Sequence, residues 1–392
     1  MTESHPVDIY INQIQLKNFR KYEEISVDLS YPLVIITGKN GSGKTSILEA
    51  ITLMSTLKSF RNVSDRDMIK FNKNFYTITL DFFSEFENKL HMGFALEEKG
   101  RKQTRVMSRN REKIEKIKDF IGLFNAVVFS PDDLQIVERS PSERRSYFDS
   151  VISMVSSDYI SNLQKYKRVI QLRSKVLHAA SVDDNYLQAM DKELIYLGSA
   201  IQQKRVDFVS KFKEAFSNYI SIISNGCDSW FLEYSPSILS GESLDVYSSE
   251  IQKSRLNDKR LRQTTRGIHR DRYYIYDSGN QNSELQVSAS QGQKRSVVLA
   301  LKMSQYEFSI KEKGMKPVLL IDDVLTELDD YRKSSFIHFL NQTGQTIITT
   351  TSVDHLNVYL NQVGSRCDYI VYEFDPEGSG LKILDNRRSH ER

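Results

Sequence analysis

The sequence contains little cysteine and no long hydrophobic run. Its two cysteines, Cys227 and Cys367, belong to no Cys-x-x-Cys pair. This arrangement argues against a structural zinc site and for a reducing compartment. No apolar run approaches the roughly 18 residues that span a bilayer, and Met1–Tyr10 lacks the apolar stretch of a signal peptide. We therefore expect a cytoplasmic protein without membrane association, and a membrane-embedded transporter subunit is excluded.

The overall charge is also small. A formal charge of +3 over 392 residues does not by itself indicate a nucleic-acid-binding protein. A hydrophobic content of 39% and a mean hydropathy of −0.45 describe a globular chain that is long enough for one large domain with an insert. Function must therefore be inferred from local motifs.

A phosphate-binding loop is present near the N-terminus. It matches G-x-x-x-x-G-K-[ST] and follows the apolar, strand-like run 33–37. Its residues are Gly38, Lys39, Asn40, Gly41, Ser42, Gly43, Lys44 and Thr45. Lys44 can reach the β and γ oxygens of a nucleotide, and the Thr45 hydroxyl can ligate Mg²⁺. A helix expected from Ser46 to Leu57 points its N-terminus at the same anion, so the loop predicts binding of ATP with Mg²⁺.

A second nucleotide motif lies far along the chain. The apolar segment 317–321 ends in Asp322 and Asp323, the pattern of a Walker B strand. Asp322 is expected to hold the Mg²⁺ shell and Asp323 to polarise the attacking water. An ordinary core strand with a polar turn leaves the paired acids unexplained. The long separation from the loop indicates a large insertion within one ATPase head.

A third motif precedes this strand. The turn 288–295 contains Ser290, Gly292 and Gln293 and opens an apolar-periodic helix, which resembles the signature motif of ABC-type ATPases. In that family the motif contacts the γ-phosphate held by a second subunit, so the resemblance implies an ATP-dependent homodimer. The strand 346–351 lacks the usual terminal histidine, and Thr350, Thr351 or Ser352 is a candidate to replace it.

The order of these motifs predicts an α/β fold with two lobes and an inserted helical domain. We assign residues 1–139 to the N-terminal lobe with the phosphate loop. Residues 140–262 form the helical insert, because a capping box at 140–143 starts a pattern that stays helical to about residue 223. Residues 263–392 form the C-terminal lobe with the signature and Walker B motifs.

Two clusters of basic residues are candidates for phosphate contacts. The first comprises Arg101, Lys102, Arg105, Arg109, Arg111, Lys113, Lys116 and Lys118. The second comprises Arg255, Lys259, Arg260, Arg262, Arg266, Arg270 and Arg272. Each can bind DNA phosphates, and each can equally be a solvated charged face. For the second cluster, a dimer contact is a further alternative.

Several blocks together resemble the RecF family of bacterial recombination and repair ATPases, which is related to SMC and Rad50 heads. They are residues 16–22, 58–61, 129–134, 141–149, 267–271 and 290–293. The most RecF-specific block is 141–149, which has the pattern Pro-x-x-Arg-Arg-x-aromatic-x-Asp. Arg139, Ile268 and Arg272 depart from the usual family residues, and none of them is an expected ATP ligand.

The resemblance implies a cytoplasmic protein that dimerises around ATP. It also implies binding at single-strand/double-strand DNA junctions, slow hydrolysis that releases the DNA, and RecA loading on gaps together with RecO and RecR. The alternative is an ATPase head associated with a nuclease, Rad50-like or overcoming-lysogenization-defect-like. A P-loop kinase fits less well because of the signature motif. No Toprim-like metal site follows Asp329, since Asp354, Asp368 and Asp375 are isolated.

Overall fold

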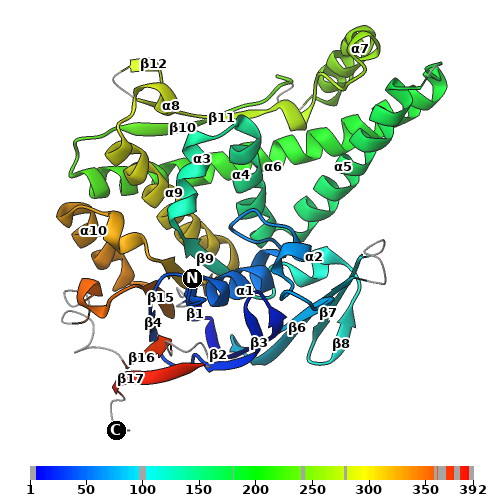
Figure 1. The fold of residues 1–392 in the computed structure, drawn as a ribbon. Coiled ribbons are helices and arrows are strands. Elements are labelled where there is room, and N and C mark those ends of the chain that lie inside the picture. The colour runs from blue at the N-terminus through cyan, green and yellow to red at the C-terminus, as the bar shows by residue number, and fades with distance from the viewer. Residues whose placement is uncertain are drawn as a thin grey trace. The chain divides into compact units, whose positions relative to one another are not determined.

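The computed structural model describes residues 6–96, 103–179, 181–239, 243–277, 280–356, 360, 368–374 and 380–387 (Figure 1). Arg101, Lys102, Cys367 and Asp375 lie outside these ranges. The chain forms two compact units. Unit 1 comprises residues 1–134, 222–225 and 298–392, and unit 2 comprises residues 135–221 and 226–297. Residues 263–297 thus cluster with the helical segment, and the division into two lobes and an insert stays a prediction.

Unit 1 contains a six-stranded sheet in the order β17-β16-β4-β15-β14-β9. Its strands are β4 (Leu33–Thr37), β9 (Ala126–Phe129), β14 (Val318–Asp322), β15 (Thr346–Thr350), β16 (Tyr369–Phe374) and β17 (Leu381–Arg387). All neighbours pair in parallel except β16 and β17. Every residue of β4, β9, β14 and β15 is buried, as expected for a parallel sheet covered on both faces. The expected strands at 33–37 and 126–129 are confirmed.

A second, antiparallel sheet of unit 1 has the order β3-β2-β5-β6-β7-β8. Its strands are β2 (Tyr10–Phe19), β3 (Tyr22–Asp28), β5 (Phe75–Phe83), β6 (Glu87–Leu96), β7 (Gln103–Arg109) and β8 (Glu112–Ile114). Helix α1 (Lys44–Thr56) shares one hydrophobic core with both sheets, and its residues from Ser46 to Ser55 are all buried. The helix begins two residues before the expected start, at the lysine of the phosphate loop.

The smaller elements of unit 1 surround these sheets. They are β1 (Val7–Asp8), β13 (Met315–Lys316), α2 (Ile117–Phe120) and α10 (Asp330–Leu340), with short 3-10 turns at Asp65–Met68, Pro131–Leu134, Val324–Glu327 and Val353–Leu356. Strand β1 pairs in parallel with β13. The buried Gln345 carboxamide, before β15, bonds to the backbone of Ile11, Leu29 and Tyr31. This side chain therefore ties the parallel sheet to β2 and the segment that follows β3.

Unit 2 is mainly helical. Its elements are α3 (Gln135–Glu138), α4 (Pro141–Val155), α5 (Ser157–Leu177), most of α6 (Asp184–Ser224), β10 (Trp230–Ser235), α7 (Leu244–Leu261), the 3-10 turn Ile268–Arg270, β11 (Arg272–Asp277), β12 (Asn280–Glu284), α8 (Leu285–Ser288) and the start of α9 (Gln291–Lys313). The capping box at Ser140–Glu143 and the helical pattern up to about residue 223 are confirmed. In the described part of the chain, no helix is long and apolar enough to cross a membrane.

The family-like blocks 141–149 and 267–271 meet at Arg205 of α6. This guanidinium is 1% exposed and forms ion pairs with Asp149 at 2.8 Å and with Asp271 at 2.6 Å. It also donates to the Ile268 carbonyl at 2.7 Å. A buried guanidinium needs such partners, because an uncompensated charge in the interior is strongly destabilising. These blocks therefore hold α4, α6 and the start of β11 together.

Candidate nucleotide site

The phosphate loop connects β4 to α1 through glycines in left-handed backbone conformations. Gly41 has φ +78° and Gly43 has φ +111°, which side-chain-bearing residues rarely adopt. A Cβ atom on Gly43 would overlap both Lys21 and Tyr22, whose hydroxyl donates to the Gly43 carbonyl at 2.9 Å. Glycine at this position is therefore required by conformation and by space.

Lys44 is the first residue of α1 and is 7% exposed. Its Nζ donates to the carbonyl oxygens of Gly38 at 2.5 Å and Lys39 at 3.0 Å. Burial lowers the pKa of Lys44, while the neighbouring Asp323 and Asp322 raise it. An ammonium held by neutral carbonyls at the N-terminus of a helix is well placed to turn toward an anionic ligand.

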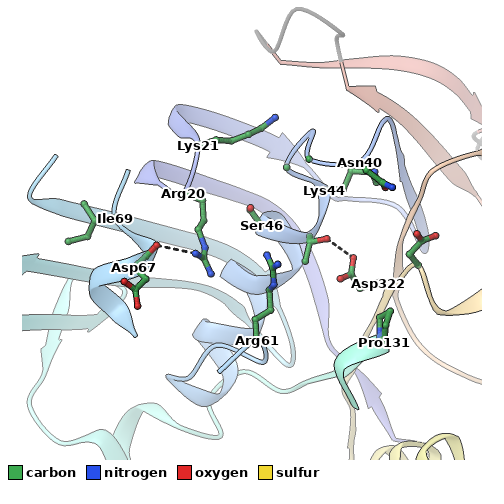
Figure 2. A pocket seen from close by; sticks show the side chains of 14 residues that line it. Arg20, Lys21, Asn40, Lys44, Ser46, Arg61, Asp67, Ile69, Pro131 and Asp322 are labelled. Carbon is green, nitrogen blue, oxygen red and sulfur yellow. Dashed lines mark hydrogen bonds between the residues drawn. The ribbon is translucent and has the colours of Figure 1, made fainter. Parts of the chain in front are cut away.

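Asp322, at the end of β14, lies next to the phosphate loop (Figure 2). Its Oδ1 accepts a hydrogen bond from Thr45 at 2.9 Å and one from Thr349 at 2.7 Å. Burial raises the pKa of Asp322, and these two hydrogen bonds oppose the shift. Mg²⁺ prefers oxygen ligands, and the Thr45 hydroxyl and the Asp322 carboxylate lie together, so these two side chains fit the expected metal. Thr349 was missed by sequence reasoning, because its contact is made across neighbouring strands.

Asp323 follows in the left-handed region, with φ 52°. Its backbone N–H donates to the Thr349 carbonyl at 3.1 Å, which fixes the turn after β14. Asp and Asn adopt this conformation more readily than other residues that carry a side chain. Asp323 and Asp322 line the same pocket as the phosphate loop.

This pocket has a volume of about 560 Å³. It is lined by Arg20, Lys21, Asn40, Gly41, Gly43, Lys44, Thr45, Ser46, Arg61, Asp67, Ile69, Pro131, Asp322 and Asp323. The loop and the Walker B acids, predicted from separate ends of the chain, are thus adjacent. The pocket also contains three cations, Arg20, Lys21 and Arg61, to which the sequence motifs assigned no role in nucleotide binding. Figure 2 shows Arg61 beside Ser46 and Asp322.

A buried carboxylate holds two of the family-like blocks against this pocket. Glu49 of α1 is fully buried and receives two hydrogen bonds from Arg20, at 2.8 and 2.6 Å. The Ser59 hydroxyl donates to the same carboxylate, and the Arg61 backbone N–H donates to Ser59 at 3.1 Å. Through these hydrogen bonds, Glu49 holds the blocks 16–22 and 58–61 close to the helix that follows the phosphate loop.

The end of β15 carries the candidates for the missing histidine. The Thr350 hydroxyl donates to the Ser352 carbonyl at 2.9 Å, while the Thr351 side chain is exposed. Thr349, one residue earlier, contacts Asp322 instead. A histidine-like role for Thr350, Thr351 or Ser352 stays a prediction.

The signature motif begins α9 and belongs to unit 2. Ser290 and Gln293 cap the helix reciprocally: the Ser290 N–H donates to Gln293 Oε1 at 2.9 Å, and the Gln293 N–H donates to Ser290 Oγ at 3.2 Å. Gln293 Nε2 also donates to Asp228 at 2.9 Å. Ser290 is exposed and Gly292 follows within the first turn, so this helix N-terminus can accept an external anion.

Many residues of the two basic clusters are bound to groups of the same chain. Arg105 pairs with Asp65, and Arg109 donates twice to Asn88 Oδ1, at 2.9 and 2.7 Å. In the second cluster, Arg255 pairs with Asp191 and Lys259 with Asp184. Arg266, Arg270 and Arg272 donate to Ser237, Thr264 and Tyr274. Their role toward DNA stays a prediction.

Replacing Asp322 with Asn tests the buried carboxylate. A raised pKa in the folded protein means that the ionised form opposes folding, so stability falls as pH rises through the raised pKa. The substituted carboxamide keeps an acceptor for Thr45 and Thr349 without the charge. We expect D322N to raise the ligand-free melting temperature by a few degrees at pH 8, and by less at pH 4, near the ordinary pKa of an aspartate. The added stability from ATP should also lose its Mg²⁺ dependence.

Differential scanning calorimetry at both pH values, with and without Mg²⁺ and ATP, measures these effects. A lower ligand-free melting temperature for D322N at pH 8 would show that the charge stabilises the fold. Thr349→Val serves as a control, since it removes one hydrogen bond to Asp322 and leaves the charge in place.

Together the fold and the site define an ABC-type P-loop ATPase head. Residues 10–367 match the family described as RecF/RecN/SMC N terminal domain. The chain is 32% identical over 353 residues to the DNA replication and repair protein RecF of Streptococcus suis (strain 05ZYH33), covering 89% of this chain and 94% of that protein. The chain therefore belongs to the RecF family of DNA replication and repair proteins.

Solved structures agree with this assignment. The structure of the recombination mediator protein RecF-ATPrS in the RecFOR pathway matches with a TM-score of 0.85 at 28% identity, covering 97% of this chain and all of that one. The Smc head domain from Pyrococcus furiosus matches with a TM-score of 0.54 at 18% identity, covering 96% of each chain. The latter shows the head fold alone.

Proposed function

We propose that this protein is an ATP-switched DNA-binding protein of replication and recombinational repair. The observation that carries the proposal is the contact between Thr45 and Asp322, which joins the phosphate loop to the Walker B strand. The backbone N–H groups of residues 38–46 and Lys44 would hold the phosphates of ATP, and Thr45 with Asp322 would hold Mg²⁺. The bound metal would neutralise phosphate charge, while Asp323 orients the attacking water.

ATP binding drives dimerisation in this proposal. The N-terminus of α9, with Ser290, Gly292 and Gln293, contacts the γ-phosphate held by the second copy of the chain. Slow hydrolysis removes that phosphate and separates the dimer. ATP thus acts as a switch, and the weak ATPase activity serves release.

The DNA partner is a single-strand/double-strand junction, bound without sequence preference, and the protein partners are RecO and RecR. In the cytoplasm, the dimer promotes the loading of RecA on gaps in DNA. Support comes from the RecF relatives and from the solved neighbour described as part of the RecFOR pathway. These relatives favour repair over the alternative of a nuclease-associated ATPase head.

Changing Ser290 to Arg is expected to prevent ATP-dependent dimerisation while leaving ATP binding intact. The bulky cation would occupy the exposed turn where the helix N-terminus must approach the partner's γ-phosphate, and Ser290 does not line the pocket with Lys44. Sedimentation velocity with a non-hydrolysable ATP analogue measures the assembly, and fluorescence of a labelled ATP measures binding.

Ser210→Arg is the matched control, because Ser210 is an exposed serine of α6 in the same unit. This control should dimerise like the wild type. An S290R protein that also dimerises with ATP would refute the arrangement in which the signature motif acts on the other subunit.

A further inference from the structure

Helix α5 carries a row of cations that have no partner among the residues that the structure describes. Lys165, Arg168 and Lys175 are exposed, and none of them forms an ion pair or a hydrogen bond in the described part of the chain. They contrast with Arg105, which pairs with Asp65, and with Arg255, which pairs with Asp191. The cations of α5 are therefore available to an external ligand.

These cations lie on one side of the helix. At 100° per residue, Lys165, Arg168 and Lys175 fall within about 80° of arc, and the exposed amides Gln164 and Gln171 extend this arc to about 120°. The five residues constitute the α5 face. The one acidic residue of α5 is Asp158, on the same side of the helix but in its first turn, seven positions and about 10 Å before Lys165, where it interacts favourably with the helix dipole. From Gln164 to Lys175, the α5 face therefore carries charge of a single sign.

The opposite side of α5 is anchored in unit 2. Tyr166 is buried and its hydroxyl is hydrogen-bonded to His269 at 2.9 Å. Arg173 is fully buried, with ion pairs to Asp191 at 3.0 Å and Asp258 at 2.8 Å. These contacts fix the rotation of the helix about its axis. The backbone positions that carry the cations of the α5 face are thus fixed before a ligand binds, while their exposed side chains can adjust to it.

The neighbouring helix α6 offers a contrast. Its exposed lysines Lys192, Lys204 and Lys213 are interspersed with acids at Glu193, Asp207 and Glu214. At helical spacing these three lysines point in different directions. A single-sign row therefore occurs on α5 and not on α6, although both helices carry several lysines.

We propose that the α5 face binds the phosphate backbone of duplex DNA. Lys165 and Lys175 are ten positions apart in the sequence, which corresponds to about 15 Å along a helix. Duplex DNA carries one negative charge per roughly 1.7 Å of axis, so several phosphates lie within that length. The cations supply affinity, and the amides of Gln164 and Gln171 can donate to phosphate oxygens without reading sequence. This inference rests on the proposed DNA-binding function and gives it a location.

The test is duplex binding in the presence of ATP across a salt series, measured by fluorescence anisotropy on the full chain. The variant K165Q/R168Q/K175Q removes three contacts and keeps good helix formers. Because each phosphate contact contributes about −0.9 to the log–log salt slope, we expect the slope to become shallower by roughly 2.7. The control K192Q/K204Q/K213Q loses the same charge from α6 and should keep the wild-type slope.

Circular dichroism and ATP binding, equal in the three proteins, show that the fold and nucleotide site are intact. Equal slopes for the α5 variant and the wild type would overturn the α5 surface and leave the proposed function standing. Equal shallowing in both triple variants would also overturn it, because net charge alone would then explain the effect. No duplex binding by the wild type would remove both the surface and the proposed function.

Discussion

Replacing Lys44 with Met is expected to abolish ATP binding. The pocket contains Asp322 and Asp323, and without the ammonium their charges would repel the phosphates. A charge-assisted hydrogen bond to phosphate would be lost from a site that is partly shielded from water. Isothermal titration calorimetry with Mg²⁺ and ATP measures the loss. Lys89→Met, at an exposed lysine of β6, is the control and should bind ATP normally.

The same substitution should leave the ligand-free protein stable. Burial lowers the pKa of Lys44, which means that its charge opposes folding at neutral pH. Met fills similar space without that charge, so the melting temperature of K44M should equal or exceed that of the wild type. Undiminished ATP affinity in a stable K44M protein would contradict the assignment of residues 38–45 to the phosphates.

Local motifs predicted the nucleotide site because each of its parts has a signature that is short in sequence. The run 33–37 followed by glycines, and the run 318–321 followed by two acids, specify strands and turns through their own residues. Their adjacency follows from parallel strands that end at one edge of a sheet, as β4 and β14 do on either side of β15. The order of the strands themselves leaves no pattern in the sequence.

Residues that act through contacts between distant segments were not predicted. Thr349 reaches Asp322 because β15 lies beside β14, and Glu49 joins Arg20 to Ser59 because α1 packs near both segments. Neither set of contacts joins residues at a fixed spacing in the sequence, so no motif predicts it. Glu49, the one acidic residue of α1, stands between Leu48 and Ala50 and was the available signal, since a carboxylate that is buried with such neighbours requires partners.

The clusters of basic residues in the sequence did not show which cations are available to bind DNA, because this also depends on contacts between distant segments. A run of arginines shows how many cations are near one another along the chain, but not which acids fold against them. Arg105 and Arg255 are paired internally, whereas the more widely spaced Lys165, Arg168 and Lys175 align on one side of a helix. The departures Arg139 and Arg272 bond to Glu143 and Tyr274, outside the nucleotide pocket.

The roles of the two Walker B acids differ in their geometry. Asp322 is buried and accepts hydrogen bonds from Thr45 and Thr349, which suits a group that stays in place beside the metal. Asp323 begins the turn after the strand and lines the pocket. A carboxylate in that position can accept a proton from water, or orient it, without taking part in phosphate binding. Binding and hydrolysis should therefore be separable by single substitutions.

Replacing Asp323 with Asn is expected to slow ATP hydrolysis by roughly 10²- to 10⁴-fold, the range for loss of a general base or water-positioning group. ATP affinity should stay near the wild-type value or rise slightly, because one negative charge near the phosphates is removed. Single-turnover hydrolysis and ATP titration on the same preparation separate the two effects. Asp330→Asn, at an acid in the first turn of α10 outside the pocket, is the control and should hydrolyse ATP normally.

Because hydrolysis releases the dimer in the proposed cycle, D323N should also remain dimeric for longer after free ATP is removed. Wild-type turnover in D323N would exclude Asp323 from the water-activating role, and rapid dissociation of a hydrolysis-deficient D323N dimer would disconnect hydrolysis from release.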